Sequence, residues 1–172
     1  WNLFHGRDFP PNGGLLTRRS RLLRRAERDA THVQVNRSLR AEFAARLAGW
    51  EWDVALLQEA PPRWLPDLEQ ATGAAGVRDL TSRNSLAPLR AWVAEWNPDL
   101  IGSNEGGSNM LLVRPPARIV ATRAETLATR PERRRLVMAR LELPGDRRSS
   151  SAACTCRSPT PVKGGRRRCR PA

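Results

Sequence analysis

This chain has no tyrosine, no long apolar run and few cysteines. All three cysteines, Cys154, Cys156 and Cys169, lie in residues 147–172, and there is no tyrosine. The first 146 residues therefore have no disulfide framework and no thiolate metal site, and Cys154-Thr155-Cys156 lacks a second pair at the spacing of a zinc site. No apolar run reaches the length of about 18 residues that a membrane span needs, so we expect no membrane span.

The start of the chain also lacks features that would fix its cellular location. It shows no signal-type segment and no initiating methionine. The natural start and any targeting segment are therefore left open, with the cytoplasm as the default expectation. We expect a monomer.

The positive charge is unevenly distributed. The chain carries a formal charge of +13, but residues 147–172 hold eight basic and no acidic residues, so 22 basic against 17 acidic residues leave +5 for the first 146. A net charge of +13 taken whole predicts a nucleic-acid or other anionic partner. The charge of the body is much weaker evidence for such a partner.

A short apolar segment ending in a carboxylate is the most informative stretch. Val54 to Leu57 is too short for an independent helix and is bounded by polar residues, which predicts a strand buried on both faces. Gln58 and Glu59 follow at its carboxyl end, where ligands collect in layered α/β folds. The alternative is that Glu59 is a solvated residue opening a loop before two prolines.

The amino terminus, Trp1 to Arg7, is a second short apolar segment, and it contains an amide. A buried amide is costly unless its hydrogen bonds are satisfied, so packing alone explains Asn2 poorly. Within it, we predict Trp1 to Phe4 to be the remnant of a first strand, and His5 lies just past that strand. It either contacts a substrate phosphate or is a hydrogen-bonded structural histidine.

Together, Trp1-Asn2-Leu3 and Leu57-Gln58-Glu59, separated by one amphipathic helix, resemble the endonuclease/exonuclease/phosphatase family of metal-dependent phosphoesterases, which includes deoxyribonuclease I and exonuclease III relatives. The resemblance implies that Glu59 binds Mg²⁺ or Mn²⁺ and that Asn2 stands beside it on the adjacent strand, orienting metal or phosphate. Oxygen ligands, waters and a substrate phosphate suit Mg²⁺ on chemical grounds as well.

Other parts of the chain fit the same resemblance. Gly107-Ser108-Asn109 is similar to a Gly-x-Asn segment that leads into a central strand, here ending in Arg114. Phe4 stands where some members carry an acidic residue. The implied partner is a phosphate-containing substrate, either nucleic acid or a small phosphoester, with His5, Arg7, Arg18 and Arg19 as candidate phosphate contacts.

The remaining pattern predicts helices alternating with strands. Apolar residues at helical spacing predict helices within 39–50, 64–71 and 89–96, and apolar or alternating runs predict strands at 77–80, 110–113, 119–127 and 135–143. The last two read as consecutive antiparallel strands. The predicted class is α+β, and the resemblance implies a partial four-layer α/β sandwich of the DNase I-like type with its second half missing.

Arginines dominate the segment from Leu15 to Arg28. These side chains either line the rim of the cleft and hold a polyanionic backbone, or form a solvated helical face. The first interpretation also allows a second function class, a basic nucleic-acid-binding protein without catalysis.

Residues 147–172 differ in composition from residues 1–146, which we assign to the N-terminal part of an endonuclease/exonuclease/phosphatase domain. Their only aliphatic residue larger than alanine is Val162, which predicts a disordered basic tail. Arginine outnumbers lysine 29 to 1, as GC-rich coding produces, and the codons possible for Ala153 to Cys156 read in a shifted frame as a strand ending near a histidine. We therefore hypothesise that the tail is a frameshift product. The family's second-half catalytic groups are then absent, and we expect little or no activity.

Overall fold

The computed structural model describes residues 1–8, 12–81, 86–100, 107–129, 134–144 and 150–155. The protein has an α+β fold. Its helices are α1 (Arg18–Leu23), α2 (Arg40–Gly49), α3 (Leu65–Thr72) and α4 (Ala87–Trp96), with short 3₁₀ turns η1 (Phe4–Gly6), η2 (Gly13–Leu15), η3 (Pro62–Trp64) and η4 (Pro98–Leu100). Its strands are β1 (Glu27–Arg28), β2 (Val33–Gln34), β3 (Val54–Ala60), β4 (Ala75–Leu80), β5 (Ser108–Val113), β6 (Arg118–Ala128), β7 (Arg134–Glu142) and β8 (Ser150–Thr155).

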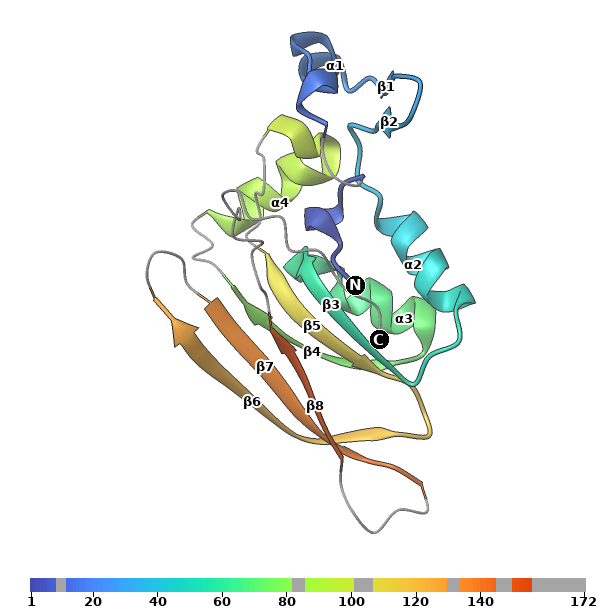
Figure 1. The fold of residues 1–172 in the computed structure, drawn as a ribbon, viewed down its shortest axis with the longest axis vertical. Coiled ribbons are helices and arrows are strands. Elements are labelled where there is room, and N and C mark those ends of the chain that lie inside the picture. The colour runs from blue at the N-terminus through green and yellow to red at the C-terminus, as the bar shows by residue number, and fades with distance from the viewer. Residues whose placement is uncertain (9–11, 82–85, 101–106, 130–133, 145–149, 156–172) are drawn as a thin grey trace, which may run out of the picture.

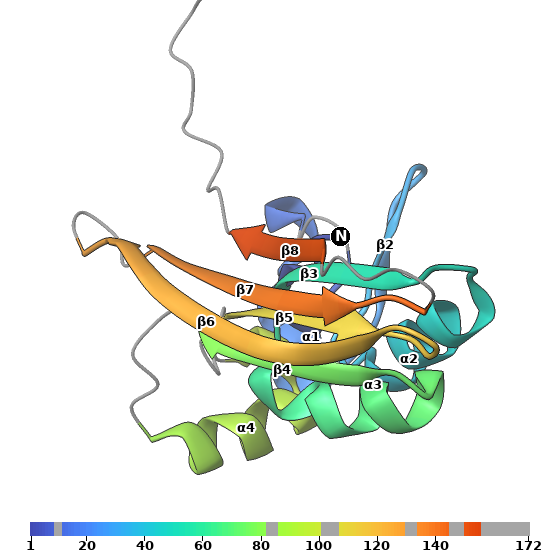
Figure 2. The same cartoon turned by 90° about the horizontal axis from the view of Figure 1, so that it is seen from below.

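The main elements stack in three layers (Figure 1). Helices α2 and α3 form the first layer, and two β-sheets form the second and third. The first sheet has the order β3-β5-β4 and the second the order β6-β7-β8, and every pairing within them is antiparallel. β1 and β2 form a separate two-stranded ribbon. Figure 2 shows the two larger sheets lying face to face, with α3 on the side of β4 away from the second sheet.

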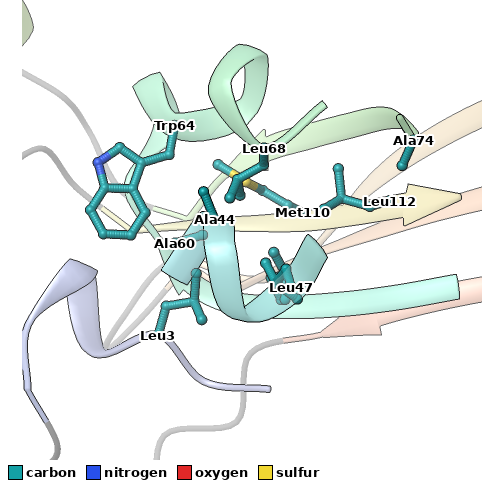
Figure 3. Packing of buried hydrophobic residues seen from close by; sticks show 10 residues of the cluster. Leu3, Ala44, Leu47, Ala60, Trp64, Leu68, Ala74, Met110 and Leu112 are labelled. Carbon is teal, nitrogen blue, oxygen red and sulfur yellow. The ribbon is translucent and has the colours of Figure 1, made fainter. Parts of the chain in front are cut away.

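The central strand β5 is buried along its whole length because both of its faces are covered. Met110 and Leu112 point toward the helices, in a cluster that includes Trp64 and Leu68 (Figure 3). Leu111 and Val113 point the other way, against residues of the second sheet. This alternation follows from the two-residue period of a strand, and burial of each large aliphatic side chain contributes about 1.5–3 kcal/mol.

Several predicted elements are confirmed. Helices α2, α3 and α4 and strands β4 to β7 occupy the predicted segments to within a few residues. In β7, Val137, Ala139 and Leu141 are buried whereas Arg140 and Glu142 are exposed, as the alternating pattern predicts. β6 and β7 pair in antiparallel fashion. In the parts of the chain that are described, no helix is long and apolar enough to cross a membrane.

The strand before Glu59 differs from its prediction. Its first three residues are half-buried rather than buried: Val54, Ala55 and Leu56. The reason is that β3 is an edge strand of its sheet, paired with β5 on one side. On its other side, the amino-terminal segment makes only an isolated bridge, so Trp1 to Phe4 is not a full strand. The strand buried on both faces is β5 instead.

The disorder predicted for residues 147–172 is wrong for part of that segment. Ser150–Thr155 form β8, which pairs with β7 along the edge opposite β6. Backbone N–H and C=O groups of an edge strand bind another strand whatever the side chains are, so a composition poor in apolar residues does not prevent pairing. Residues 145–149 and 156–172 lie outside the described part of the chain.

Candidate functional site

The amino-terminal segment runs alongside the carboxyl end of β3. Asn2 forms an isolated parallel bridge with Gln58. The Leu3 amide donates to the Gln58 carbonyl at 2.9 Å, and the Gln58 amide donates to the Trp1 carbonyl at 2.8 Å. The backbone at Asn2 therefore lies beside that of Gln58, the residue before Glu59.

The Asn2 side chain shapes the turn that follows it. Its Oδ1 accepts a hydrogen bond from the Phe4 amide at 2.8 Å. Phe4, His5 and Gly6 all have positive φ, an uncommon conformation for residues other than glycine. The amide thus satisfies one donor of a tight turn, η1, and this turn carries His5 back toward β3.

Glu59 occupies a bulge. The pairing of β3 with β5 shifts register between Leu57 and Ala60, and Glu59 has φ 51°. An extra residue in one strand bends it and re-aims the side chain, and such bulges are frequent beside active sites. A non-glycine residue held at positive φ also stores strain that the surrounding structure must maintain.

His5 and Glu59 meet at this bulge. His5 Nε2 lies 3.7 Å from Glu59 Oε2, and about a quarter of each side chain is exposed, 26% and 24%. Burial lowers the pKa of His5 below its ordinary value; the Glu59 carboxylate opposes this shift, and the charge of Arg7 adds to it. His5 is therefore mainly neutral at pH 7.

Gly107 and Thr81 complete the surroundings of the pair. A β-carbon on Gly107 would lie 3.0 Å from His5 Cε1 and 3.5 Å from Glu59 Cα, so the backbone itself packs there. Thr81 donates from its hydroxyl to the Gly107 carbonyl at 2.6 Å and from its amide to the same oxygen at 3.0 Å. Gly107 belongs to the Gly-x-Asn segment, but no sequence signal distinguishes Thr81.

The space between the two sheets becomes polar near this end. Asn109, opposite Asp79 across β5 and β4, is fully buried and donates from Nδ2 to the Arg135 carbonyl at 2.9 Å. Arg135 also forms an ion pair with Asp79 between the sheets. The apolar packing of the sandwich thus gives way to charged and amide groups two residues from Gly107.

The guanidinium of Arg7 pairs with a carboxylate other than that of Glu59. It forms an ion pair with Asp99 of η4, and both residues are nearly inaccessible, with 9% and 6% exposed. Gln34 supports the same carboxylate, donating from Nε2 to Oδ2 at 3.4 Å. This position supports a structural role for Arg7 and argues against the predicted phosphate contact.

Arg18 and Arg19 lie on α1, and both are exposed. Figure 1 shows α1 as the outermost helix, beyond η1. The structure thus places these arginines on the surface, and none of the described contacts joins them to Glu59. Both interpretations of this segment, a rim for phosphate and a solvated face, remain predictions.

The donor set can be tested against the implied metal. The described residues hold no group of three or more His, Cys, Asp and Glu side chains that could bind an ion. At the bulge stand one carboxylate, Glu59, and one imidazole, His5, which is close enough to share an ion with it. Mg²⁺ is commonly bound by one or two carboxylates together with waters and substrate phosphates. These groups therefore fit a weakly held Mg²⁺ or Mn²⁺ that retains several waters.

Comparisons with known proteins assign no family. No protein-family description matches the sequence, and no characterised protein matches it. A solved structure, described as a functionally unknown conserved protein from Enterococcus faecalis V583, is similar with a TM-score of 0.47 and 14% sequence identity, over 66% of this chain. This chain spans 42% of the length of that protein.

Proposed function

We propose that this chain is the N-terminal part of a DNase I-like metal-dependent phosphoesterase domain, with Glu59 as its divalent-metal ligand. One observation carries the proposal. The parallel bridge between Asn2 and Gln58 brings the amino-terminal turn beside the end of β3, so that His5 lies 3.7 Å from Glu59. The stacking of a helical layer on two antiparallel sheets supports a partial sandwich of this type.

The residues at the site have separable roles in this proposal. The Glu59 carboxylate binds Mg²⁺ or Mn²⁺, and Asn2 holds the η1 turn through its bond to the Phe4 amide. His5, neutral at pH 7 because burial lowers its pKa, offers a hydrogen bond without adding positive charge. When bound, the ion would neutralise negative charge on a phosphate oxygen.

The proposed reaction is hydrolysis of a phosphoester. A water oxygen forms a bond to phosphorus while the bond between phosphorus and the leaving oxygen breaks, and the leaving oxygen takes up a proton. Glu59 would hold the metal that binds the phosphate, with His5 beside it and with Asn2 fixing the η1 turn that carries His5. The water-activating groups are expected from the part of the domain that the family resemblance assigns to its second half.

The proposal is tested first by metal binding. Mn²⁺ titration of the 172-residue chain, followed by electron paramagnetic resonance, should show weak binding that Glu59→Gln reduces about tenfold or more, since the carboxylate ligand is lost. Glu51→Gln is the matched control, because Glu51 is exposed just before the opposite end of the same strand. Equal binding by both variants and the unmodified chain would refute the assignment of Glu59.

Activity is tested separately with a chromogenic phosphodiester in the presence of Mg²⁺ or Mn²⁺. We expect turnover to be absent or very small. Clear metal-dependent turnover that Glu59→Ala abolishes would show that this chain holds a complete site. Nucleic-acid binding that weakens steeply with salt and ignores chelation of the metal would favour the alternative, a basic binding protein without catalysis.

A further inference from the structure

Helix α4 presents its large apolar side chains outward. Leu89, Trp92 and Trp96, at positions i, i+3 and i+7, share one face of the helix, and 70% of the Trp92 surface is exposed. No residue of α4 is buried. A helix usually turns its apolar stripe toward the core, whereas the apolar stripe of α4 faces away from it.

Helix α1 adds a second apolar and strongly basic element. Leu22 and Leu23 are exposed there, 65% and 58%, among arginines that include Arg18. The two helices are joined directly, because Asn97, which caps the end of α4, donates from Nδ2 to the Arg21 carbonyl. Figure 1 shows α1 and α4 at the same end of the molecule. We call this region the α1–α4 surface and define it by Arg18, Leu22, Leu23, Leu89, Trp92 and Trp96.

Two acidic residues near this surface, Glu95 and Asp99, are paired with cations of the body, whereas Glu27 accepts a hydrogen bond from the hydroxyl of Thr17 at the start of α1. Glu95 of α4 forms ion pairs with Arg40 and Arg63, on α2 and η3. Asp99 of η4 pairs with Arg7. The α1 arginines Arg18 and Arg19, by contrast, have no ion-pair partner among the described residues. The α1–α4 surface is therefore cationic as well as apolar.

We propose that the α1–α4 surface binds peripherally to a membrane that contains anionic lipids. Tryptophan and leucine lie at the boundary between headgroups and acyl chains, while arginines contact lipid phosphates. Both features of the surface are used in this complex. A nucleic acid would use the arginines and could stack on tryptophan, but it leaves the exposed leucines without a partner. Two copies packed face to face would bring like charges together.

The first test is partition of the full chain onto sedimented vesicles. Phosphatidylcholine vesicles that contain phosphatidylglycerol should bind the chain, and vesicles of phosphatidylcholine alone should bind it much more weakly. Leu89→Gln with Trp92→Gln should weaken partition about tenfold or more, as expected for lost burial of two large apolar side chains. This pair changes no charge, so residues 147–172 contribute equally in both proteins.

One matched control and one further pair of substitutions accompany this pair. Val120→Gln with Leu127→Gln also replaces two exposed apolar side chains by glutamine, on β6, where both are about half exposed, and should leave partition unchanged. Arg18→Gln with Arg19→Gln should reduce binding to anionic vesicles about 30-fold, which is about 2 kcal/mol for the loss of two basic residues near the surface. Thermal melts by circular dichroism check that each variant is folded.

A second measurement needs no disruptive variant. Tryptophan fluorescence of the unmodified chain should be quenched by lipids brominated near the headgroup, and Trp92→Phe should reduce that quenching. Absence of quenching, or partition that the Leu89 and Trp92 changes leave intact, would overturn the proposal. So would a nucleic-acid complex without vesicle binding, or a dimer in analytical ultracentrifugation that the same pair dissociates without vesicle binding.

Discussion

His5 Nε2 lies 3.7 Å from Glu59 Oε2, although 53 residues separate them in the sequence. Each residue has a positive φ, so neither reaches this position by an ordinary helix or strand conformation. The contact depends on a turn that Asn2 stabilises and on a bulge in β3. Strained backbone that holds two ionisable groups together is more typical of functional sites than of packing alone.

The first prediction concerns the pH dependence of stability. Burial lowers the pKa of His5 below its ordinary 6.5, so below that pH the unfolded chain binds more protons at this position than the folded chain. The contribution of His5 therefore makes unfolding easier as pH falls from about 7 toward 5. In urea unfolding, the difference in unfolding free energy between the unmodified chain and His5→Gln should therefore be smaller at pH of about 5 than at pH of about 7.

The comparison with His5→Gln is needed because another group titrates in the opposite sense. Burial raises the pKa of Asp8, so its protonation favours the folded state as pH falls. Both proteins contain Asp8, and its effect cancels in their difference. A difference in unfolding free energy that stays constant across the pH range would contradict the shift of His5.

The second prediction concerns Gly6. A β-carbon there would lie 2.5 Å from two ring atoms of Trp64 and 3.0 Å from Pro61 Cγ, and Gly6 has φ +76°. Overpacking costs about 1–3 kcal/mol, and a left-handed conformation costs a residue with a β-carbon about 1 kcal/mol more. Gly6→Ala should therefore lower the unfolding free energy by about 3 kcal/mol.

Gly13→Ala is the control for this prediction, because a β-carbon on Gly13 meets nothing within 4 Å. Its effect should stay within about 0.5 kcal/mol, as for surface substitutions in general. Chemical denaturation of both variants provides the measurement. A Gly6→Ala chain as stable as the Gly13→Ala chain would show that η1 does not pack against Trp64 as described.

The third prediction concerns Arg114, which closes the carboxyl end of α2. Its guanidinium donates to the carbonyls of Leu47, Ala48 and Trp50 at 2.7–3.0 Å and lies 4.2 Å from the ring centroid of Trp52. Carbonyls at a helix end have no partner within the helix, and a planar guanidinium can bind several of them while stacking on an aromatic ring.

Lysine cannot reproduce this geometry, so Arg114→Lys should destabilise the fold by about 2 kcal/mol, the worth of two lost hydrogen bonds. Arg118→Lys is the matched control, because Arg118 is 76% exposed in its ion pair with Glu142. Its effect should be under about 0.5 kcal/mol. Melting curves of the two variants that coincide would rule out the capping role.

The extent to which sequence predicts this fold differs between elements. Periodic patterns identify α2, α4 and β7 well because apolar spacing reflects burial directly. They fail for the position of β3 within its sheet, since strand order depends on contacts between distant segments. They also fail for the outward face of α4, because periodicity specifies an apolar face without specifying what covers it.

The candidate site was only partly predictable. Asn2 and Glu59 stand out because polar groups at the ends of apolar segments need an explanation. Thr81 and the buried ion pair of Arg7 with Asp99 do not, because a threonine or an arginine in a loop carries no local signal of its partner. The turn at His5 depends on the hydrogen bond that the Phe4 amide donates to the side chain of Asn2, and the sequence alone does not indicate this bond.

The last prediction concerns β8, which composition alone predicts to be disordered. Its register with β7 runs from Leu136 opposite Thr155 to Leu141 opposite Ser150. Only alternate residues of an antiparallel edge strand exchange hydrogen bonds with their partner. Hydrogen exchange followed by NMR should therefore show every second amide of Ser150–Thr155 protected, as in the other edge strand, β6, while the intervening amides exchange freely. Exchange of all these amides at the rate of an unfolded peptide would show that β7 has a free edge, and that the composition of the segment predicts its behaviour better than the pairing does.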